Sequence, residues 1–302
     1  MTRDEKYIKV CGGLGNQMFQ YAFYKALSKK LQDYDVYLDT YWFTLIKKEL
    51  PEHQKLTDDF TPRKYELDLF KNINPKFIPQ ETVKAYFAQR SKPNQTQREI
   101  LEEKMIVEKS AFEYDEKLLE VQPKRFFSGY FQNEEYFKHF KDELVKDFEL
   151  PEFDKKDKHN QKLLKEIQNS NSVMIHIRRG DYLALNQELP LEYYKKAVEY
   201  IIENVKKPKF YVFGIDSDEF IKKELKLKHK FKFIGNKNHE NNEDWKDFKL
   251  MQECKHAIIA NSAFSWWAAW LGDYQGKIVT APSPWLDNHD ECICKNWVKI
   301  SR

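Results

Sequence analysis

The sequence predicts an α/β protein with two parallel-sheet domains. Short apolar runs typical of buried strands alternate with segments of helical period near the N-terminus, and again from residue 172 onward. Strand–helix–strand units of this kind place their strands in a parallel sheet. The chain has 302 residues, which exceeds one ordinary small domain and suits two. The simplest architecture is two Rossmann-like domains with a cleft between them.

The N-terminal half starts with a strand–helix–strand unit and then becomes irregular. Between residues 41 and 122, repeated prolines and a polar stretch predict loops and short helices. A further strand and an amphipathic helix follow. The predicted elements of this half are, in order, a strand Tyr7–Cys11, a glycine turn Gly12–Gly15, a helix Met18–Leu31, a strand Val36–Leu38, a strand Phe126–Phe131 and a helix Glu134–Phe148.

The C-terminal half alternates strands and helices at intervals typical of a doubly wound parallel sheet. Its predicted elements are, in order, a strand Val173–Ile177, a helix Leu191–Val205, a strand Phe210–Gly214, a helix Glu219–Leu225, a strand Phe231–Ile234, a helix Asp244–Cys254, a strand Ala257–Ala260, a helix Ser262–Leu271 and a strand Ile278–Thr280. The polar stretch Pro151–Asn160 is the predicted linker. We therefore divide the chain into residues 1–155 and 156–302.

Composition excludes several classes of protein. The 51 basic and 48 acidic residues give a formal charge of only +3, so we expect no nucleic-acid partner. Four cysteines without a zinc-binding pattern favour free thiols in a reducing compartment. The charged N-terminus lacks the apolar segment of a signal peptide, and no window approaches the roughly 20 apolar residues of a membrane span. We expect a soluble, cytoplasmic protein.

The most informative motif is SVMIHIRRGDY, at residues 172–182. A buried strand runs into Arg178 and Arg179, whose fork-shaped, permanently charged side chains suit a phosphate or diphosphate. The carboxyl ends of strands are where ligands bind in open α/β sheets. His176 and Asp181 would then shape the pocket. The alternative is a surface turn with two solvated arginines.

A second motif, NSAFSWW, follows the predicted strand Ala257–Ala260. Asn261 or Ser262 would cap the next helix, whose first backbone N–H groups and positive dipole end suit an anion. Hydroxyl groups of Ser262 and Ser265 could add donors. The alternative is a well-capped core helix whose tryptophans pack on the sheet.

The N-terminal motif GGLGNQMFQ resembles part of a nicotinamide-binding fingerprint. Gly13, Gly15 and the strand-terminal Asp39 imitate that pattern, but Met18 occupies the third glycine position and would obstruct close helix–strand packing. No Gly-Lys-Ser/Thr follows, so the motif is not a Walker A loop either. A purely structural tight turn is the alternative. The residues expected to hydrogen bond to a sugar or phosphate are Asn16 and Gln17.

Two carboxylates, Asp216 and Asp218, follow the predicted strand Phe210–Gly214. They could hold a divalent cation on a nucleotide diphosphate. They could instead cap the next helix together with Glu219, or recognise the ribose or base of a nucleotide. Because two arginines already supply positive charge, we rank capping or nucleotide recognition above metal binding and expect no metal site.

Four motifs in order resemble the α-1,2-fucosyltransferase family, and the resemblance runs over nearly the whole chain. They are GGLGNQMFQYA (residues 12–22), GYFQNEEYF (129–137), HIRRGDY (176–182) and CKHAIIANSAFSWWAAWL (254–271). The resemblance implies transfer of L-fucose from GDP-fucose to the 2-hydroxyl of a terminal galactose. It also implies inversion, a GT-B-like two-domain fold, and no metal or other cofactor.

The resemblance also implies roles for particular residues and domains. His176, Arg178 and Arg179 would bind the donor's diphosphate and fucose, and the turn at Gly15–Asn16 would lie at the cleft. Residues 156–302 would form the GDP-fucose-binding domain and residues 1–155 the acceptor-side domain. The remaining expected substrate-binding residues are Gly13, Gln17, Tyr182, Asp216, Asp218, Asn261, Ser262, Phe264 and Ser265. Family members usually show Phe-Ser-Asp-Asp where this chain has FGIDSD at 213–218, which displaces the carboxylates.

The expected chemistry is stabilisation of a departing diphosphate. Arg179, Arg178 and the helix start at Ser262 would stabilise its developing negative charge. An acceptor hydroxyl would attack from the opposite face, with Asp181 or Asp39 as the candidate general base.

Two other classes of function remain open from the sequence. The N-terminal unit with Asp39 suits a nicotinamide-dependent oxidoreductase. The aromatic content, with 17 Tyr, 22 Phe and 7 Trp, suits a non-catalytic glycan-binding protein, although this leaves the paired arginines unexplained. Basic residues also leave open a weak peripheral contact with an anionic membrane that carries a lipid-linked acceptor.

Overall fold

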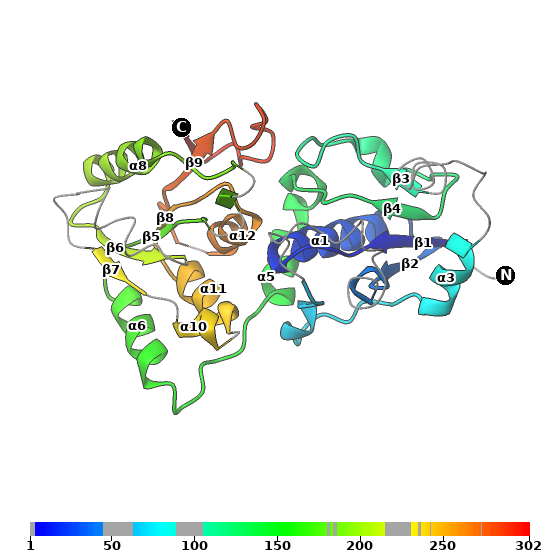
Figure 1. Ribbon diagram of the computed structural model, residues 1–302, viewed down its shortest axis with the longest axis horizontal. Coiled ribbons are helices and arrows are strands. Elements are labelled where there is room, and N and C mark those ends of the chain that lie inside the picture. Colours follow the sequence, from blue (N-terminus) through cyan, green and yellow to red (C-terminus); the bar gives the residue numbers. More distant parts are fainter. Residues whose placement is uncertain are drawn as a thin grey trace. The chain divides into compact units, whose positions relative to one another are not determined.

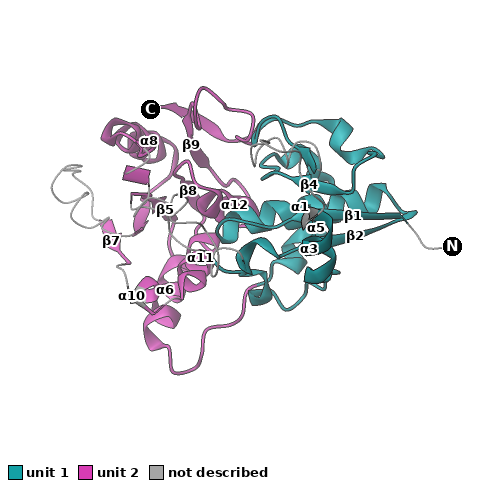
Figure 2. Ribbon diagram, turned by 45° about the vertical axis from the view of Figure 1, so that its right-hand side comes forward, with its two compact units in different colours: residues 1–149 teal, residues 150–302 magenta. Residues whose placement is uncertain are grey.

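The computed structural model describes residues 4–44, 63–88, 105–179, 182–183, 186–214, 231–234, 237–241, 243–272 and 274–302. The chain forms two compact units, residues 1–149 and 150–302 (Figure 2). The described strands of each unit pair in parallel, with helices against the sheet (Figure 1). The predicted α/β class with two parallel-sheet domains is thereby confirmed. The expected division after residue 155 lies between Leu150 and the first helix of unit 2.

Unit 1 is built on a sheet of order β2-β1-β4-β3. Strand β1 lies inside it, with Tyr7 paired to Tyr37 of β2 and to Phe126 of β4. The described elements are β1 Asp4–Lys9, α1 Leu14–Lys30, β2 Tyr34–Asp39, the 3₁₀ turn η2 Leu67–Leu69, α3 Gln80–Ala88, β3 Met105–Val107, η3 Glu116–Leu119, β4 Phe126–Ser128, η4 Glu134–Tyr136, η5 Lys138–Phe140 and α5 Lys141–Asp147.

The prediction of one helix over Glu134–Phe148 is wrong. The segment is divided into η4, η5 and α5, and the first break lies at Phe137, which adopts φ −141° and ψ −3°. The Phe137 side chain is completely buried, and its ring lies 5.9 Å from that of Phe19 on α1. Burial of this ring thus overrides the helical pattern of the sequence.

Unit 2 is built on a sheet of order β10-β9-β8-β5-β6-β7. If these six strands are numbered 1 to 6 in chain order, their order in the sheet from β7 to β10 is 3-2-1-4-5-6, which is the Rossmann order. The order reverses between β5 and β8. The described elements are α6 Lys158–Gln168, β5 Ser172–His176, α8 Leu191–Asn204, β6 Lys209–Phe213, β7 Phe231–Phe233, α10 Lys237–Glu240, α11 Asp244–Gln252, β8 His256–Ile258, α12 Ala263–Leu271, β9 Val279–Ser283 and β10 Val298–Ser301. The sequence predicted most of these, but not α6, α10 or β10, and the predicted helix Glu219–Leu225 lies outside the described residues.

The helices of unit 2 cover both faces of its sheet (Figure 1). The apolar stripe of α8, including Tyr194 and Val198, packs on a core that contains Val173 and Ile175 of β5. On α12, the ring of Phe264 lies 6.0 Å from that of His176 at the end of β5. Burial on both faces explains why the strands of this unit read as nearly continuous apolar runs.

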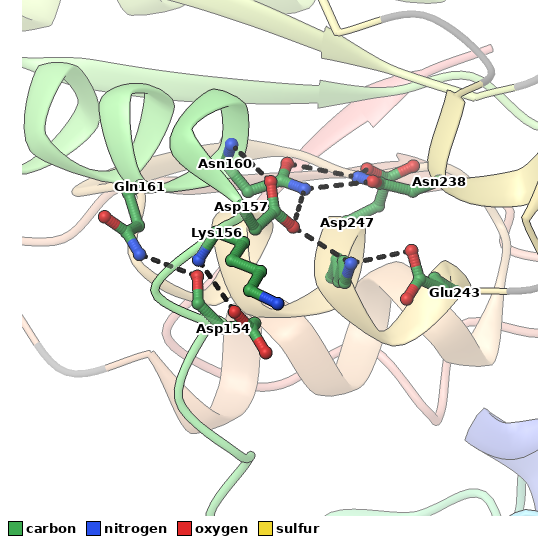
Figure 3. Close-up of polar contacts among 9 residues, drawn as sticks. Asp154, Lys156, Asp157, Asn160, Gln161, Asn238, Glu243 and Asp247 are labelled. Atoms are coloured by element: carbon green, nitrogen blue, oxygen red, sulfur yellow. Dashed lines mark hydrogen bonds and ion pairs between the residues drawn. The ribbon is translucent and has the colours of Figure 1, made fainter.

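The predicted linker Pro151–Asn160 requires a correction, because its end belongs to α6. Asp157 caps this helix, and its Oδ1 accepts a hydrogen bond of 3.1 Å from the backbone N–H of Asn160. Asn160 is buried and donates to Asn238 Oδ1 over 3.1 Å (Figure 3). Asn238 in turn donates to Asp247 Oδ1 over 2.5 Å. Residues that the sequence predicted to be part of a polar linker therefore belong to a hydrogen-bond network inside unit 2.

Asp247 gives this network a predictable pH dependence. Burial raises the pKa of its carboxyl to about 6, against the hydrogen bond from Asn238. Because the pKa is raised in the folded state, the stability tied to this group is intact below about pH 4 and is lost as the pH rises through 6. Asp247→Asn keeps the acceptor oxygen without the charge. We expect it to raise the free energy of unfolding at pH 7 by about 2–3 kcal/mol.

Urea unfolding followed by tryptophan fluorescence, at about pH 4 and about pH 7, measures this effect. The exposed Asp287, changed to Asn, is the matched control and is expected to alter stability equally little at both pH values. An Asp247→Asn variant that is no more stable than the wild type at pH 7 contradicts the prediction.

Candidate active site

The two sequence motifs of unit 2 meet at the carboxyl ends of neighbouring strands. His176 ends β5 and is followed by Arg178 and Arg179, while Asn261 and Ser262 follow β8. These strands pair directly, with Ile175 opposite Ile258. They also flank the point at which the strand order reverses, where open α/β sheets bind their ligands.

Tyr182 connects the two motifs. Its hydroxyl donates to the backbone carbonyl of Asn261 over 3.0 Å, and the Arg178 guanidinium carbon lies 5.2 Å from the centre of its ring. Asn261 Nδ2 donates to the Gln187 carbonyl over 2.9 Å. The Nε of Arg179 lies 3.7 Å from the carboxylate of Glu188. The segment that follows β5 is thereby held against the end of β8.

Two buried polar atoms at this edge have no hydrogen-bond partner among the described residues. They are His176 Nδ1 and Asn261 Oδ1, and their side chains are 5% and 1% exposed. An unsatisfied buried polar group costs about 1–3 kcal/mol. Such groups call for an explanation, of which a bound polar ligand is one. Their position beside the paired arginines points to a polar, anionic ligand.

His176 contributes hydrogen bonding here rather than charge. Burial, reinforced by the nearby charge of Arg178, lowers the pKa of its imidazole to about 3. The ring is therefore neutral over the physiological range, with one nitrogen able to donate and the other able to accept.

Helix α12 begins at the same edge. Ser262 is its N-cap, and its side chain makes no capping hydrogen bond to the described chain. The Ser265 hydroxyl is buried and donates to the carbonyls of Ala260 and Ser262, both at 3.3 Å. The two serines predicted together thus differ: Ser265 supports the helix start, whereas the Ser262 side chain makes no capping bond to it. Phe264 packs its ring on His176 and also on Phe248, at 5.0 Å.

Sequence reasoning missed residues that position these strand ends. On α8, the Tyr194 hydroxyl donates to the His176 carbonyl over 3.3 Å, and the Tyr193 hydroxyl donates to the Ile259 carbonyl over 2.5 Å. At Gly214, which has φ +126°, an added Cβ would lie 2.0 Å from the carbonyl oxygen of Ile177. The only signals in the sequence were a tyrosine pair within an amphipathic stripe and a glycine at a strand end.

In unit 1, the glycine turn after β1 is held by amide side chains. Gly12 has φ +80°, a conformation that favours glycine. Asn16 Oδ1 accepts a hydrogen bond of 2.8 Å from Gln132 Nε2. Gln20, which the sequence did not single out, accepts from the Cys11 amide over 3.0 Å and donates to the Gly129 carbonyl over 2.9 Å. The ends of β1 and β4 are therefore linked.

The other predicted residues of this turn are engaged internally. Gln17 is fully buried, and its Nε2 donates to the carbonyls of Gly12 and Lys64, both at 2.8 Å. Its Oε1 accepts from the Glu66 amide over 2.9 Å. Gln17 thus supports the turn through the backbone of a distant segment. Gly13 is the N-cap of α1, and Gly15 lies buried in the first turn of that helix.

Asp39 ends β2 and is completely buried. Its oxygens accept hydrogen bonds from the Tyr41 amide at 2.9 Å and from Trp42 Nε1 at 2.8 Å. Burial raises the pKa of its carboxyl, against these two hydrogen bonds. The carboxylate closes the turn after β2, so a role as base would require it to gain access to substrate. The other predicted carboxylates, Asp181, Asp216 and Asp218, lie outside the described residues.

A family model described as Glycosyl transferase family 11 matches residues 6–301. The chain belongs to glycosyltransferase family 11. The membership confirms the resemblance to fucosyltransferases carried by the four motifs. It also favours a glycosyltransferase over the nicotinamide-dependent oxidoreductase and the non-catalytic glycan-binding protein.

Two curated relatives from Escherichia coli match over nearly their full length. The α-1,2-colitosyltransferase is 31% identical, over 97% of this family 11 chain and 98% of its own. The O-antigen biosynthesis glycosyltransferase WbnK is 27% identical, over 97% of this chain and all of its own.

A solved structure of the fucosyltransferase NodZ from Bradyrhizobium overlaps 88% of this chain and 92% of its own, with a TM-score of 0.48 and 14% identity. Among the described residues of this family 11 member, no helix is both long enough and apolar enough to cross a bilayer.

Proposed function

We propose that this glycosyltransferase moves L-fucose from GDP-β-L-fucose to the 2-hydroxyl of a terminal galactose in an oligosaccharide, with inversion. The observation that carries the proposal is the convergence of the paired arginines with the start of α12 where the strand order of unit 2 reverses. Beside them lie the unsatisfied His176 Nδ1 and Asn261 Oδ1. This combination suits a nucleotide diphosphate attached to a hydroxylated sugar.

The chemistry follows from the charge that develops on the departing diphosphate. Arg178, Arg179 and the backbone N–H groups at the start of α12 stabilise that charge in the transition state. The anomeric carbon acquires oxocarbenium character as its bond to the diphosphate oxygen breaks. The acceptor oxygen then attacks from the opposite face and loses its proton. Asp181 is our first candidate for the base, and Asp39 the alternative.

In this proposal the two units divide the substrates. Unit 2 binds GDP-fucose through the edge just described. Unit 1 contributes the turn at Gly15–Asn16 and supplies acceptor specificity. We place that specificity in the region after β2 that the sequence predicts to be irregular. This region begins at the same carboxyl edge of the unit 1 sheet as the glycine turn.

A second donor deserves a direct test, because one relative bears the name α-1,2-colitosyltransferase and is 31% identical. The second candidate function is therefore transfer of colitose from its GDP-activated form. Both candidates use the same diphosphate site, so they differ in contacts to the sugar alone.

The test is a GDP-release assay with each donor over a panel of galactose-terminated acceptors, followed by linkage analysis of the product. The proposal expects acceptor-dependent GDP release from GDP-fucose and an α-1,2-fucosylated galactose. Turnover with the colitose donor alone would select the second candidate. Binding of GDP without turnover of either donor would reject both.

We expect the transfer to proceed without a metal ion, because two guanidinium groups and a helix start already supply positive charge to the diphosphate. EDTA should leave the rate of GDP release within about twofold of the untreated enzyme. The assay is run with EDTA and again after addition of Mn²⁺. A large loss that Mn²⁺ restores would instead support a metal site at Asp216 and Asp218.

A further inference from the structure

Glu108 follows β3 at the carboxyl edge of the unit 1 sheet and binds the loop that follows β4. Its backbone amide donates to the Ser128 carbonyl over 3.1 Å, which continues the pairing of the two strands. Its carboxylate accepts hydrogen bonds from two consecutive backbone amides, those of Tyr130 and Phe131, the latter at 2.9 Å. A single side chain thus fixes the first turn of the chain after β4.

The backbone around this carboxylate is shaped to receive it. A Cβ added to Gly129 would lie 2.4 Å from Glu108 Cδ, so the carboxylate occupies the space that any other residue would fill. Phe131 adopts φ +53°, a conformation that is costly for a bulky residue and that persists only where the surroundings impose it. The two amide hydrogen bonds to Glu108 are part of those surroundings.

The loop held by Glu108 leads directly to the glycine turn. Gln132 follows Phe131 in the chain. Its side-chain Nε2 donates to Asn16 Oδ1 over 2.8 Å, and its backbone N–H donates to the Ala111 carbonyl over 2.8 Å. At the other end of the loop, Gln20 donates to the Gly129 carbonyl over 2.9 Å. Hydrogen bonds at residues 130–132, together with the backbone that joins these residues, therefore connect Glu108 to Asn16.

We propose that Glu108 is a positioning residue for the transfer reaction, which holds residues 129–132 so that Gln132 orients the Asn16 amide toward substrate. The inference rests on the proposed function, because it takes the turn at Asn16 to contact a substrate. Glu108 itself acts through its neighbours: both of its oxygens accept backbone hydrogen bonds.

The protonation state of Glu108 makes this role sensitive to pH. Burial raises the pKa of its carboxyl to about 7, against the hydrogen bonds from Tyr130 and Phe131. Protonation converts one acceptor oxygen into a hydroxyl and weakens its hydrogen bond to the loop. Within the folded protein, the hydrogen bonds from the two loop amides are therefore strongest with the ionised carboxylate above pH 7, whereas the stability against unfolding that is tied to this buried carboxyl is lost as the pH rises through 7.

Two described titratable groups interact with Glu108. They are Cys11, which precedes the glycine turn, and Tyr136 on η4. Burial raises the pKa of each, so both stay uncharged through neutral pH. His176 stays neutral as well, since its pKa is about 3.

The first experiment measures kcat/KM for the acceptor between about pH 5.5 and pH 8.5. In the wild type we expect a rise with a midpoint near 7. In Glu108→Gln, whose amide can accept only one of the two backbone hydrogen bonds, we expect roughly tenfold lower kcat/KM at pH 8 and no inflection near 7. GDP affinity should be unchanged, since that site is assigned to unit 2. Glu120→Gln, an exposed carboxyl of the same unit, should behave as wild type.

A second variant and a direct measurement keep the inference testable if Glu108→Gln folds poorly. Gly129→Ala leaves Glu108 in place but displaces its carboxylate, and should reproduce the loss at pH 8. In the unliganded wild type, the amide resonances of Tyr130 and Phe131 should titrate together with a midpoint near 7.

The outcomes separate this inference from the proposed function. A wild type that releases no GDP from either donor rejects the function, whereas the amide titration still reports on Glu108. Resonances that do not titrate overturn the inference. So does an active Glu108→Gln enzyme that keeps the wild-type inflection near pH 7.

Discussion

Replacing Arg179 with alanine is expected to lower kcat for GDP release by about 10²–10³-fold while leaving the fold intact. The loss follows from removing a charged, fork-shaped donor that stabilises the departing diphosphate. The fold should survive because the Arg179 side chain is 29% exposed and its neighbour Glu188 is 44% exposed, so no buried charge is left behind. Single-turnover GDP release and a thermal melt measure the two effects separately.

Two further variants define what Arg179 supplies. Arg179→Lys keeps the charge and loses the fork, so we expect intermediate activity. Arg125→Ala removes an exposed arginine of unit 1, with a side chain 54% exposed, and should leave activity unchanged. Near-normal turnover by Arg179→Ala would remove Arg179 from the mechanism.

Replacing Gly214 with alanine should have the largest effect on stability. The added Cβ would lie 2.0 Å from the carbonyl oxygen of Ile177 and 3.0 Å from its carbonyl carbon. Neither strand can move away easily, because the Ile177 amide donates to the Phe213 carbonyl over 2.9 Å. The free energy of unfolding should fall by about 3 kcal/mol or more. GDP affinity should fall at least tenfold, because Arg178 follows Ile177 directly.

The chain offers a matched control for the backbone conformation. Gly276 also has a positive φ, +80°, but an added Cβ there meets no atom within 4 Å. Gly276→Ala should therefore cost only the conformational penalty of about 1–2 kcal/mol and leave GDP affinity unchanged. Denaturant unfolding and calorimetric titration with GDP compare the pair. Equal losses in the two variants would show that the close approach to Ile177 contributes nothing.

Strands and helices with strong local patterns were predictable from sequence. The strand at 173–177 and the helix beginning at Leu191 were recognised because burial on both faces, or on one stripe, is visible in the residues themselves. The break at Phe137 and the burial of Asn160 were not, since each depends on a partner distant in sequence. Such partners override local preference without leaving a local signal.

The residues of the candidate site also fall into those that the sequence predicted and those that it did not. The anion-binding residues Arg178, Arg179 and Ser262 were identified because their residue types at strand ends carry a chemical meaning. Residues that hold them in place, such as Tyr194 and Gln20, resemble ordinary core residues in the sequence. Glu108 was invisible for a further reason: its role depends on a glycine that follows another strand.

The uncharged state of His176 has a consequence for how a nucleotide reaches this protein. Before the ligand arrives, the positive potential at this edge comes from guanidinium groups whose number of charges is constant from mildly acidic to mildly alkaline solution. Dissolved electrolyte screens the long-range electrostatic attraction that steers an anion, and the size of this effect depends on the charges that the protein carries. The contribution of these guanidinium groups to the rate of capture should therefore decline with ionic strength along the same curve at either end of that range.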